Sequence, residues 1–258
     1  MNPASIAELL QISTDLLWQG SVVFFRVAAV VSLLPAFGER TVPMRIKLAA
    51  TIAFVLIIGP AAPSPPFEPG LDGLIRLTLT ETLAGLLLGL GIRMFVLALQ
   101  TAGSIAAQST SLSQILGGAV ADPLPAMGYI LIIAGLALAA MTGLHVKAAA
   151  LVILSYDLLP MGQFLGGDII SMWGTAQIKS AFALAFTLAA PFVILSVIYN
   201  LALGVINKAM PQLMVAFVGA PVITAGGLLL LALAAPYMLE VWLTALNTFL
   251  LTPFRMPQ

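Results

Sequence analysis

Apolar stretches that are long enough to cross a lipid bilayer recur along this chain. Three of them run from about Leu16 to Phe37, from Leu74 to Leu99 and from Ala181 to Ile206. A membrane-spanning helix needs about 20 mostly apolar residues, and only helices or closed barrels satisfy their own backbone hydrogen bonds in lipid. These stretches lack the alternation of apolar and polar residues that barrel strands require. They therefore predict an α-helical membrane protein.

Further apolar segments complete the pattern: Ile46–Ile58, Met127–Thr142, Ala148–Leu165 and Leu213–Leu251. The last is long enough to fold back as a hairpin near Pro236, and we expect an interruption at Pro191, because proline breaks or kinks helices. We predict an all-α, polytopic integral membrane protein of about six to eight apolar helices arranged as hairpins. One domain is expected to cover residues 1–258.

The composition agrees with this class and excludes several functions. Hydrophobic residues make up 61% of the chain and charged residues 8%, whereas soluble domains carry about 25% charged residues. The basic residues form no cluster longer than Arg40–Lys47, so nucleic acid is not an expected partner. The chain has no cysteine, a single histidine (His145) and no nucleophile or phosphate-binding motif. We therefore expect neither an enzyme nor a metal or other cofactor.

Arg26 lies near the middle of the first apolar segment. An arginine at the centre of a membrane helix costs about 2.5–3.5 kcal/mol on translocon scales, so it is expected to have a partner. Asp157 and Glu240 also lie in apolar surroundings and are the candidates. Two interpretations of this buried charge are open. It either holds helices or subunits together, or it lies at a translocation path.

A second pattern lies in the third apolar segment, where Glu81, Gly85, Gly89 and Arg93 follow one another at intervals of four. This spacing places them along one slowly drifting stripe of a helix. Glycines four apart let another helix approach closely, and the flanking charges can set its register. The stripe therefore predicts a packing face, either for a helix of the same chain or for another subunit.

A polar stretch rich in small residues, Gln100–Pro125, separates two apolar segments and is expected to be the least helical part of the chain. Its candidate functional residues are Gly103, Gln108, Ser109, Ser111, Gly117, Gly118, Asp122 and Pro123. Polar backbone at membrane depth is tolerated only where it is buried in protein or lines a watery cavity. The stretch is therefore either a surface loop or a re-entrant segment that plugs a pore.

Short motifs follow one another along nearly the whole chain: Phe25-Arg26, Pro35–Arg40 and Pro43–Arg45, then Gly103 with Ala121–Pro123, then Gly143–His145 with Ser155 and Leu159-Pro160, then Asn207–Gln212 with Gly219–Pro221. Their order and identity resemble the FliR family of export-gate subunits in flagellar type III secretion, which is related to the SctT subunit of injectisomes. The chain departs from the family pattern at Gln108–Ser111, where a Met-Gly pair is common. It also departs at Met214, where asparagine is common, and at Val222-Ile223, where a basic residue is common.

This resemblance implies a multi-pass protein of the bacterial inner membrane, in the flagellar basal body. One copy would assemble with FliP-like and FliQ-like subunits, contacted by an FlhB-like protein, into a gate through which unfolded export substrates pass. Residues 1–206 would be a FliP-like part, and residues 207–258 a FliQ-like helical hairpin. The polar loop from Gly103 to Pro125 would correspond to the plug of the closed pore. Membrane lipid would be the other contact.

A second function of a different class is a secondary transporter with a midplane charged site formed by Arg26 and Asp157. Transporter folds often contain paired broken helices in two related halves. The sequence shows no such internal symmetry, so the export gate is the preferred interpretation. An accessory or scaffolding membrane protein is a third interpretation. Co-purification with FliP-like and FliQ-like subunits would favour the export gate over the transporter and the scaffolding protein.

Overall fold

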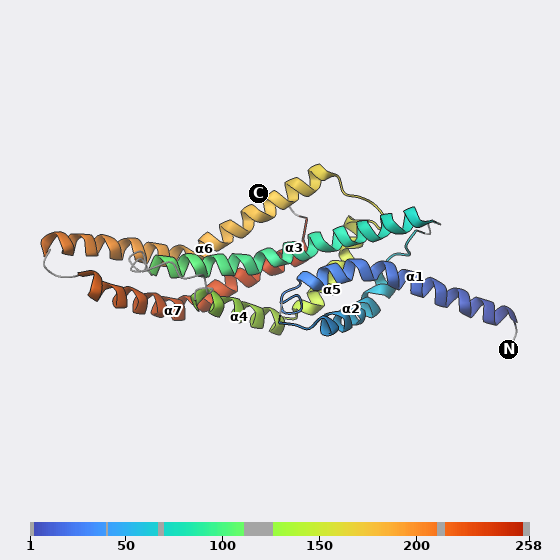
Figure 1. Cartoon of the computed structure of the whole chain (residues 1–258), viewed down its shortest axis with the longest axis horizontal. Helices are drawn as coiled ribbons and strands as arrows, with labels where there is room; N and C mark the ends of the chain where they lie inside the picture. Colours follow the sequence, from blue (N-terminus) through green and yellow to red (C-terminus); the bar gives the residue numbers. More distant parts are fainter. Residues whose placement is uncertain (1–2, 40, 67–69, 111–125, 211–214, 255–258) are drawn as a thin grey trace.

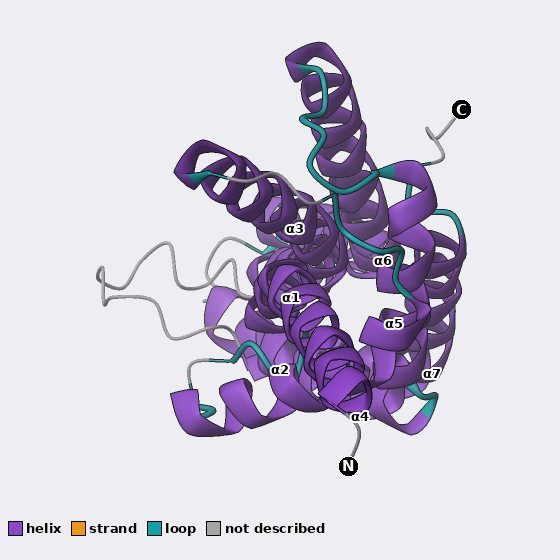
Figure 2. Cartoon of the chain, turned by 90° about the vertical axis from the view of Figure 1, so that its right-hand side faces the viewer, coloured by secondary structure: helices purple, strands orange, loops and turns teal. Residues whose placement is uncertain are grey.

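The computed structural model describes residues 3–39, 41–66, 70–110, 126–210 and 215–254, and within these ranges every regular element is a helix (Figures 1 and 2). In chain order they are α1 (Pro3–Leu33), α2 (Met44–Ile58), the short 3₁₀ helix η1 (Gly59–Ala61), α3 (Leu71–Thr110), α4 (Ala126–Met141), α5 (Leu144–Leu158), α6 (Gly167–Ala209) and α7 (Val215–Leu251). The predicted all-α class is confirmed.

Five helical segments are long and apolar enough to cross a membrane: α1, α2 together with η1, α3, α6 and α7. Helices α4 and α5 meet at a bend of 72° and together form a sixth candidate span. These helices confirm the prediction of a polytopic membrane protein. With 40 and 43 residues, α3 and α6 are each about 60 Å long at 1.5 Å per residue, roughly twice the thickness of the hydrocarbon core.

Helix α3 runs through the middle of an elongated molecule and contacts α1, α4, α6 and α7 (Figure 1). Its amino-terminal half packs in parallel along α1, and its carboxyl-terminal half packs against α4 and α6. The buried core along α3 consists of large aliphatic residues followed by small ones: Leu88, Ile92, Leu99, Ala102 and Ala106. Small residues allow helix backbones to approach closely, which is the usual basis of packing between membrane helices. The core of the molecule therefore follows α3 from end to end.

Two predicted breaks at prolines are wrong. Helix α6 begins at Gly167, well before the expected start, and passes through Pro191 without a break, although its direction changes partway along (Figure 1). Helix α7 (Val215–Leu251) passes through Pro236 without folding back, so the hairpin expected near Pro236 is not formed within these described residues. A proline frees about one backbone carbonyl, whereas a turn in apolar surroundings would expose several unpaired groups. Continuing the helix is therefore the less costly solution.

The first part of the polar stretch that is expected to be the least helical part of the chain, residues 100–110, instead forms the last turns of α3. The hydroxyl of Ser109 donates to the carbonyl oxygen of Ala106 at 2.8 Å, and that of Thr110 donates to the same oxygen at 3.1 Å. Such bonds to the preceding turn satisfy hydroxyls without any loop. The remaining predicted plug residues, Ser111, Gly117, Gly118, Asp122 and Pro123, lie outside the described residues.

A buried ion-pair network as the candidate functional site

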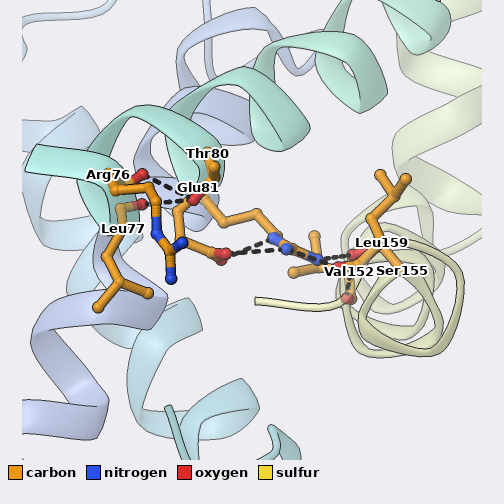
Figure 3. A network of polar contacts seen from close by, with 8 residues as sticks. Arg76, Leu77, Thr80, Glu81, Val152, Ser155 and Leu159 are labelled. Atoms are coloured by element: carbon orange, nitrogen blue, oxygen red, sulfur yellow. Dashed lines mark hydrogen bonds and ion pairs between the residues drawn. The ribbon is translucent and has the colours of Figure 1, made fainter. Parts of the chain in front are cut away.

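Arg26 of α1 forms a bidentate ion pair with Glu81 of α3 in the interior of the molecule (Figure 3). Arg26 Nε donates to Oε2 at 2.9 Å, and Nη2 donates to Oε1 at 3.1 Å. The side chains are 1% and 0% exposed. The planar guanidinium matches the two carboxylate oxygens in this arrangement, which gives both strength and a defined orientation. The pair therefore fixes the position of α1 on α3.

The rest of the Arg26 guanidinium is directed at the carboxyl-terminal end of α5 (Figure 3). Nη1 donates to Ser155 Oγ at 2.9 Å, and Nη2 donates to the carbonyl oxygen of Leu159 at 2.9 Å. The ring of Tyr156 lies 4.0 Å from the guanidinium carbon. The last carbonyls of a helix lack partners within it and carry partial negative charge, so a cation is stabilised there. One side chain thus joins α1, α3 and α5.

The structure corrects the predicted partner of Arg26. Asp157 follows Ser155 and Tyr156 on α5 but is exposed, because successive helical residues point about 100° apart. Glu240 is exposed on α7 and does not contact Arg26. The midplane site of Arg26 and Asp157 that a transporter would use is therefore not formed. The missed partner, Glu81, was identified only as part of the glycine stripe, although it too is a carboxylate in an apolar segment.

All four residues of that stripe lie against α1 or the turn that follows it. A Cβ atom on Gly85 would collide with the carbonyl oxygen of Arg26, and one on Gly89 would lie 2.9 Å from Leu33 Cβ. Beyond the glycines, Arg93 forms an ion pair with Glu39. The stripe Glu81, Gly85, Gly89 and Arg93 is therefore a contact within this chain rather than with another subunit.

Two further hydrogen bonds join α7 and α6 to α3. The indole Nε1 of Trp242 on α7 donates to the carbonyl oxygen of Phe95 on α3 at 2.8 Å. At the far end of α3, Ser196 Oγ of α6 donates to the carbonyl oxygen of Ser109. Among the residues described, no group of three or more His, Cys, Asp or Glu side chains is arranged to hold a metal ion. The Arg26 network and these two hydrogen bonds each join separate helices.

Comparison with known proteins identifies the family to which this chain is similar. The family described as "Bacterial export proteins, family 1" matches residues 17–249. The chain is 31% identical to the flagellar biosynthetic protein FliR of Caulobacter vibrioides over 226 residues, which cover 86% of this chain and 90% of the relative. It is 28% identical to FliR of Escherichia coli, with 82% of each chain covered, and 25% identical to FliR of Bacillus subtilis, with 90% of each covered. The chain therefore belongs to the FliR family of bacterial export proteins.

Proposed function

We propose that this chain is an export-gate subunit of the flagellar type III secretion apparatus. Together with FliP-like and FliQ-like subunits it would form the pore through which unfolded flagellar proteins leave the cell, and an FlhB-like protein would contact it. Two observations support the proposal. The relatives of this chain are flagellar biosynthetic and bacterial export proteins, and its helices are long and apolar enough for a membrane-embedded protein. The pore, the named partners and the location in the inner membrane at the flagellar basal body are parts of the proposal.

The observation that carries the proposal is the apolar surface that the helices leave uncovered. Over the membrane-spanning windows only 28% of α6 and 22% of α7 are buried within the chain. Large apolar side chains are exposed far along α6, among them Val197, Leu201 and Val205, with Leu201 70% exposed. A bilayer core of about 30 Å covers only half of a helix of this length. Neighbouring protein subunits are needed to cover the rest, as in a large membrane assembly.

Purification of the tagged chain from native membranes in mild detergent tests this function. We expect FliP-like and FliQ-like proteins to co-purify in a complex much larger than one chain, identified by mass spectrometry. Leu201→Arg places a charge on the exposed apolar face of α6 and should reduce their recovery. Ser171→Arg, on an exposed position in the first turns of the same helix, is the matched control and should leave recovery unchanged. A lone monomer or homodimer of the wild-type chain would contradict the proposal.

The same proposal assigns the segment between α3 and α4 to the plug of the closed gate. Deleting residues 111–118 should leave the complex assembled but make the membrane leak ions or small molecules. Ser109 is retained in this variant because its carbonyl oxygen accepts the bond from Ser196. The measurement is dye or ion influx into cells that produce the variant complex, compared with cells that produce the wild type. Unchanged permeability in a fully assembled complex would show that the segment is not a plug.

A further inference from the structure

Glu240 is the only charged residue of α7, and its side chain is exposed. No hydrogen bond or ion pair to its carboxylate occurs among the described residues, in contrast to Glu81 and Glu39, whose carboxylates are both paired with arginines. The neighbouring exposed side chains are large and apolar, and Leu233 and Tyr237 are 65% and 71% exposed. A carboxylate with no partner among the described residues therefore lies at the end of an uncovered apolar stretch of α7, and the exposed Thr244 and Thr248 follow it at intervals of four.

Lipid is a poor cover for this face. The candidate span of α7 runs from Val222 to Leu251, and every window of about 20 residues within it, from 222–241 to 232–251, includes Glu240. A bilayer that covers the carboxyl-terminal half of α7 (Val215–Leu251) therefore places this carboxylate within the membrane-spanning part of the helix. Acidic side chains in such segments face protein or a water-filled cavity and pair with another group. Among the described residues, no such group pairs with Glu240.

Water is an equally poor cover. The hydroxyls of Thr244 and Thr248, which follow Glu240 at intervals of four, donate to carbonyl oxygens of the preceding turn at 2.9 Å. They are satisfied by their own helix and do not require solvent. A wall of a watery channel would be expected to carry polar side chains at positions 233 and 237, where leucine and tyrosine stand. The face is therefore suited to contact with another apolar helix.

We propose that this face of α7, centred on Glu240, is the docking surface for a transmembrane helix of a partner subunit that carries a lysine or arginine opposite Glu240. The inference rests on the proposed function, because it requires a membrane complex. A second copy of α7 does not fit, because α7 has no basic residue and two copies would bring like charges together. The buried pair of Arg26 and Glu81 shows that this fold uses the same chemistry to join helices within the chain.

Site-specific photocrosslinking in native membranes tests the inference. A photoreactive amino acid is introduced at position 237 or 244, and at Met44 of α2 as an exposed control on another helix. We expect the two α7 positions, but not the control, to crosslink to one transmembrane segment that contains a lysine or arginine. Crosslinks to lipid alone, or to a segment without a basic residue, would overturn the inference.

Charge exchange provides the second measurement. Glu240→Lys should abolish the crosslink from position 237 and the recovery of the partner subunit, and Glu240→Gln should weaken the crosslink and the recovery. In the Glu240→Lys background, changing the basic residue of the partner to glutamate should restore the crosslink and the recovery. If wild-type chain recovers partner subunits and Glu240→Lys recovers the same set with the same crosslink, this inference fails alone. If the wild-type chain recovers no partner, the proposed function fails and this inference fails with it.

Discussion

Replacing Arg26 by alanine is expected to destabilise the protein by about 3–5 kcal/mol, because breaking a buried pair leaves an uncompensated charge. Glu81 is 0% exposed and would lose both of its guanidinium donors. Ser155 and the carbonyl of Leu159 would lose theirs as well. A loss of this size lowers the thermal midpoint of a chain of this length by roughly 10 °C. The measurement is thermal loss of the monodisperse gel-filtration peak in detergent.

The chain contains a matched control for this experiment. Arg93 also donates to both carboxylate oxygens of Glu39, through Nη1 and Nη2, but the two side chains are 30% and 29% exposed. Exposed pairs contribute at most about 1 kcal/mol, so Arg93→Ala should have a much smaller effect. Arg26→Lys should lie between the two, because lysine keeps the charge but lacks the fork that satisfies both carboxylate oxygens. Equal losses for Arg26→Ala and Arg93→Ala would argue against the burial-based explanation.

A double substitution separates stability from transport. Replacing a buried ion pair by apolar residues of similar volume is often neutral or stabilising, so Arg26→Met with Glu81→Met should recover much of the stability that Arg26→Ala loses. If secretion of flagellar proteins recovers with it, Arg26 only holds helices together. If the double variant is stable and assembled but secretion stays lost, the network has a direct role in export. This experiment decides between the two interpretations of Arg26 that follow from the sequence.

Replacing Gly85 by valine is expected to produce the second large loss. Its Cβ atom would collide with the Arg26 carbonyl oxygen and lie 2.8 Å from Ala29 Cβ, and these atoms belong to a neighbouring helix that cannot give way locally. Overpacking typically costs about 1–3 kcal/mol. Here we expect the upper end or more, because moving α1 away from α3 also stretches the Arg26–Glu81 pair one turn along. The thermal midpoint and the amount of protein in membranes are the measurements.

Gly174 of α6 is the matched control for Gly85. It is also a glycine inside a long apolar helix, but a Cβ atom built on it would meet nothing within 4 Å. Gly174→Val should therefore be close to neutral, since it adds no collision. If both variants lose the same stability, the effect comes from valine in a helix and not from the contact between α1 and α3.

The sequence was enough to single out most residues of the candidate site, but it did not show which side chains pair with one another. Arg26 was identified because a charge inside an apolar segment requires a partner, and the stripe from Glu81 to Arg93 because residues four apart share a helix face. The candidate partners of Arg26 were Asp157 and Glu240, and Glu81, which is also a carboxylate in an apolar segment, was identified only as part of the stripe. Spacing along the chain does not say which way each helix is turned. The choice of Glu81 depends on α1 and α3 packing in parallel with Gly85 between them.

The apolar segments of the sequence are sufficient to predict a helical membrane protein, because in lipid each segment must satisfy its own backbone hydrogen bonds and only long apolar helices do so. They do not determine where those helices continue. Pro191 and Pro236 lie within unbroken helices, and residues 100–110 extend α3, because each of these local costs is small beside the hydrogen bonds that a break would leave unpaired. The side-chain partners follow from helix packing and not from spacing along the chain, because pairing depends on how each helix is rotated against its neighbours.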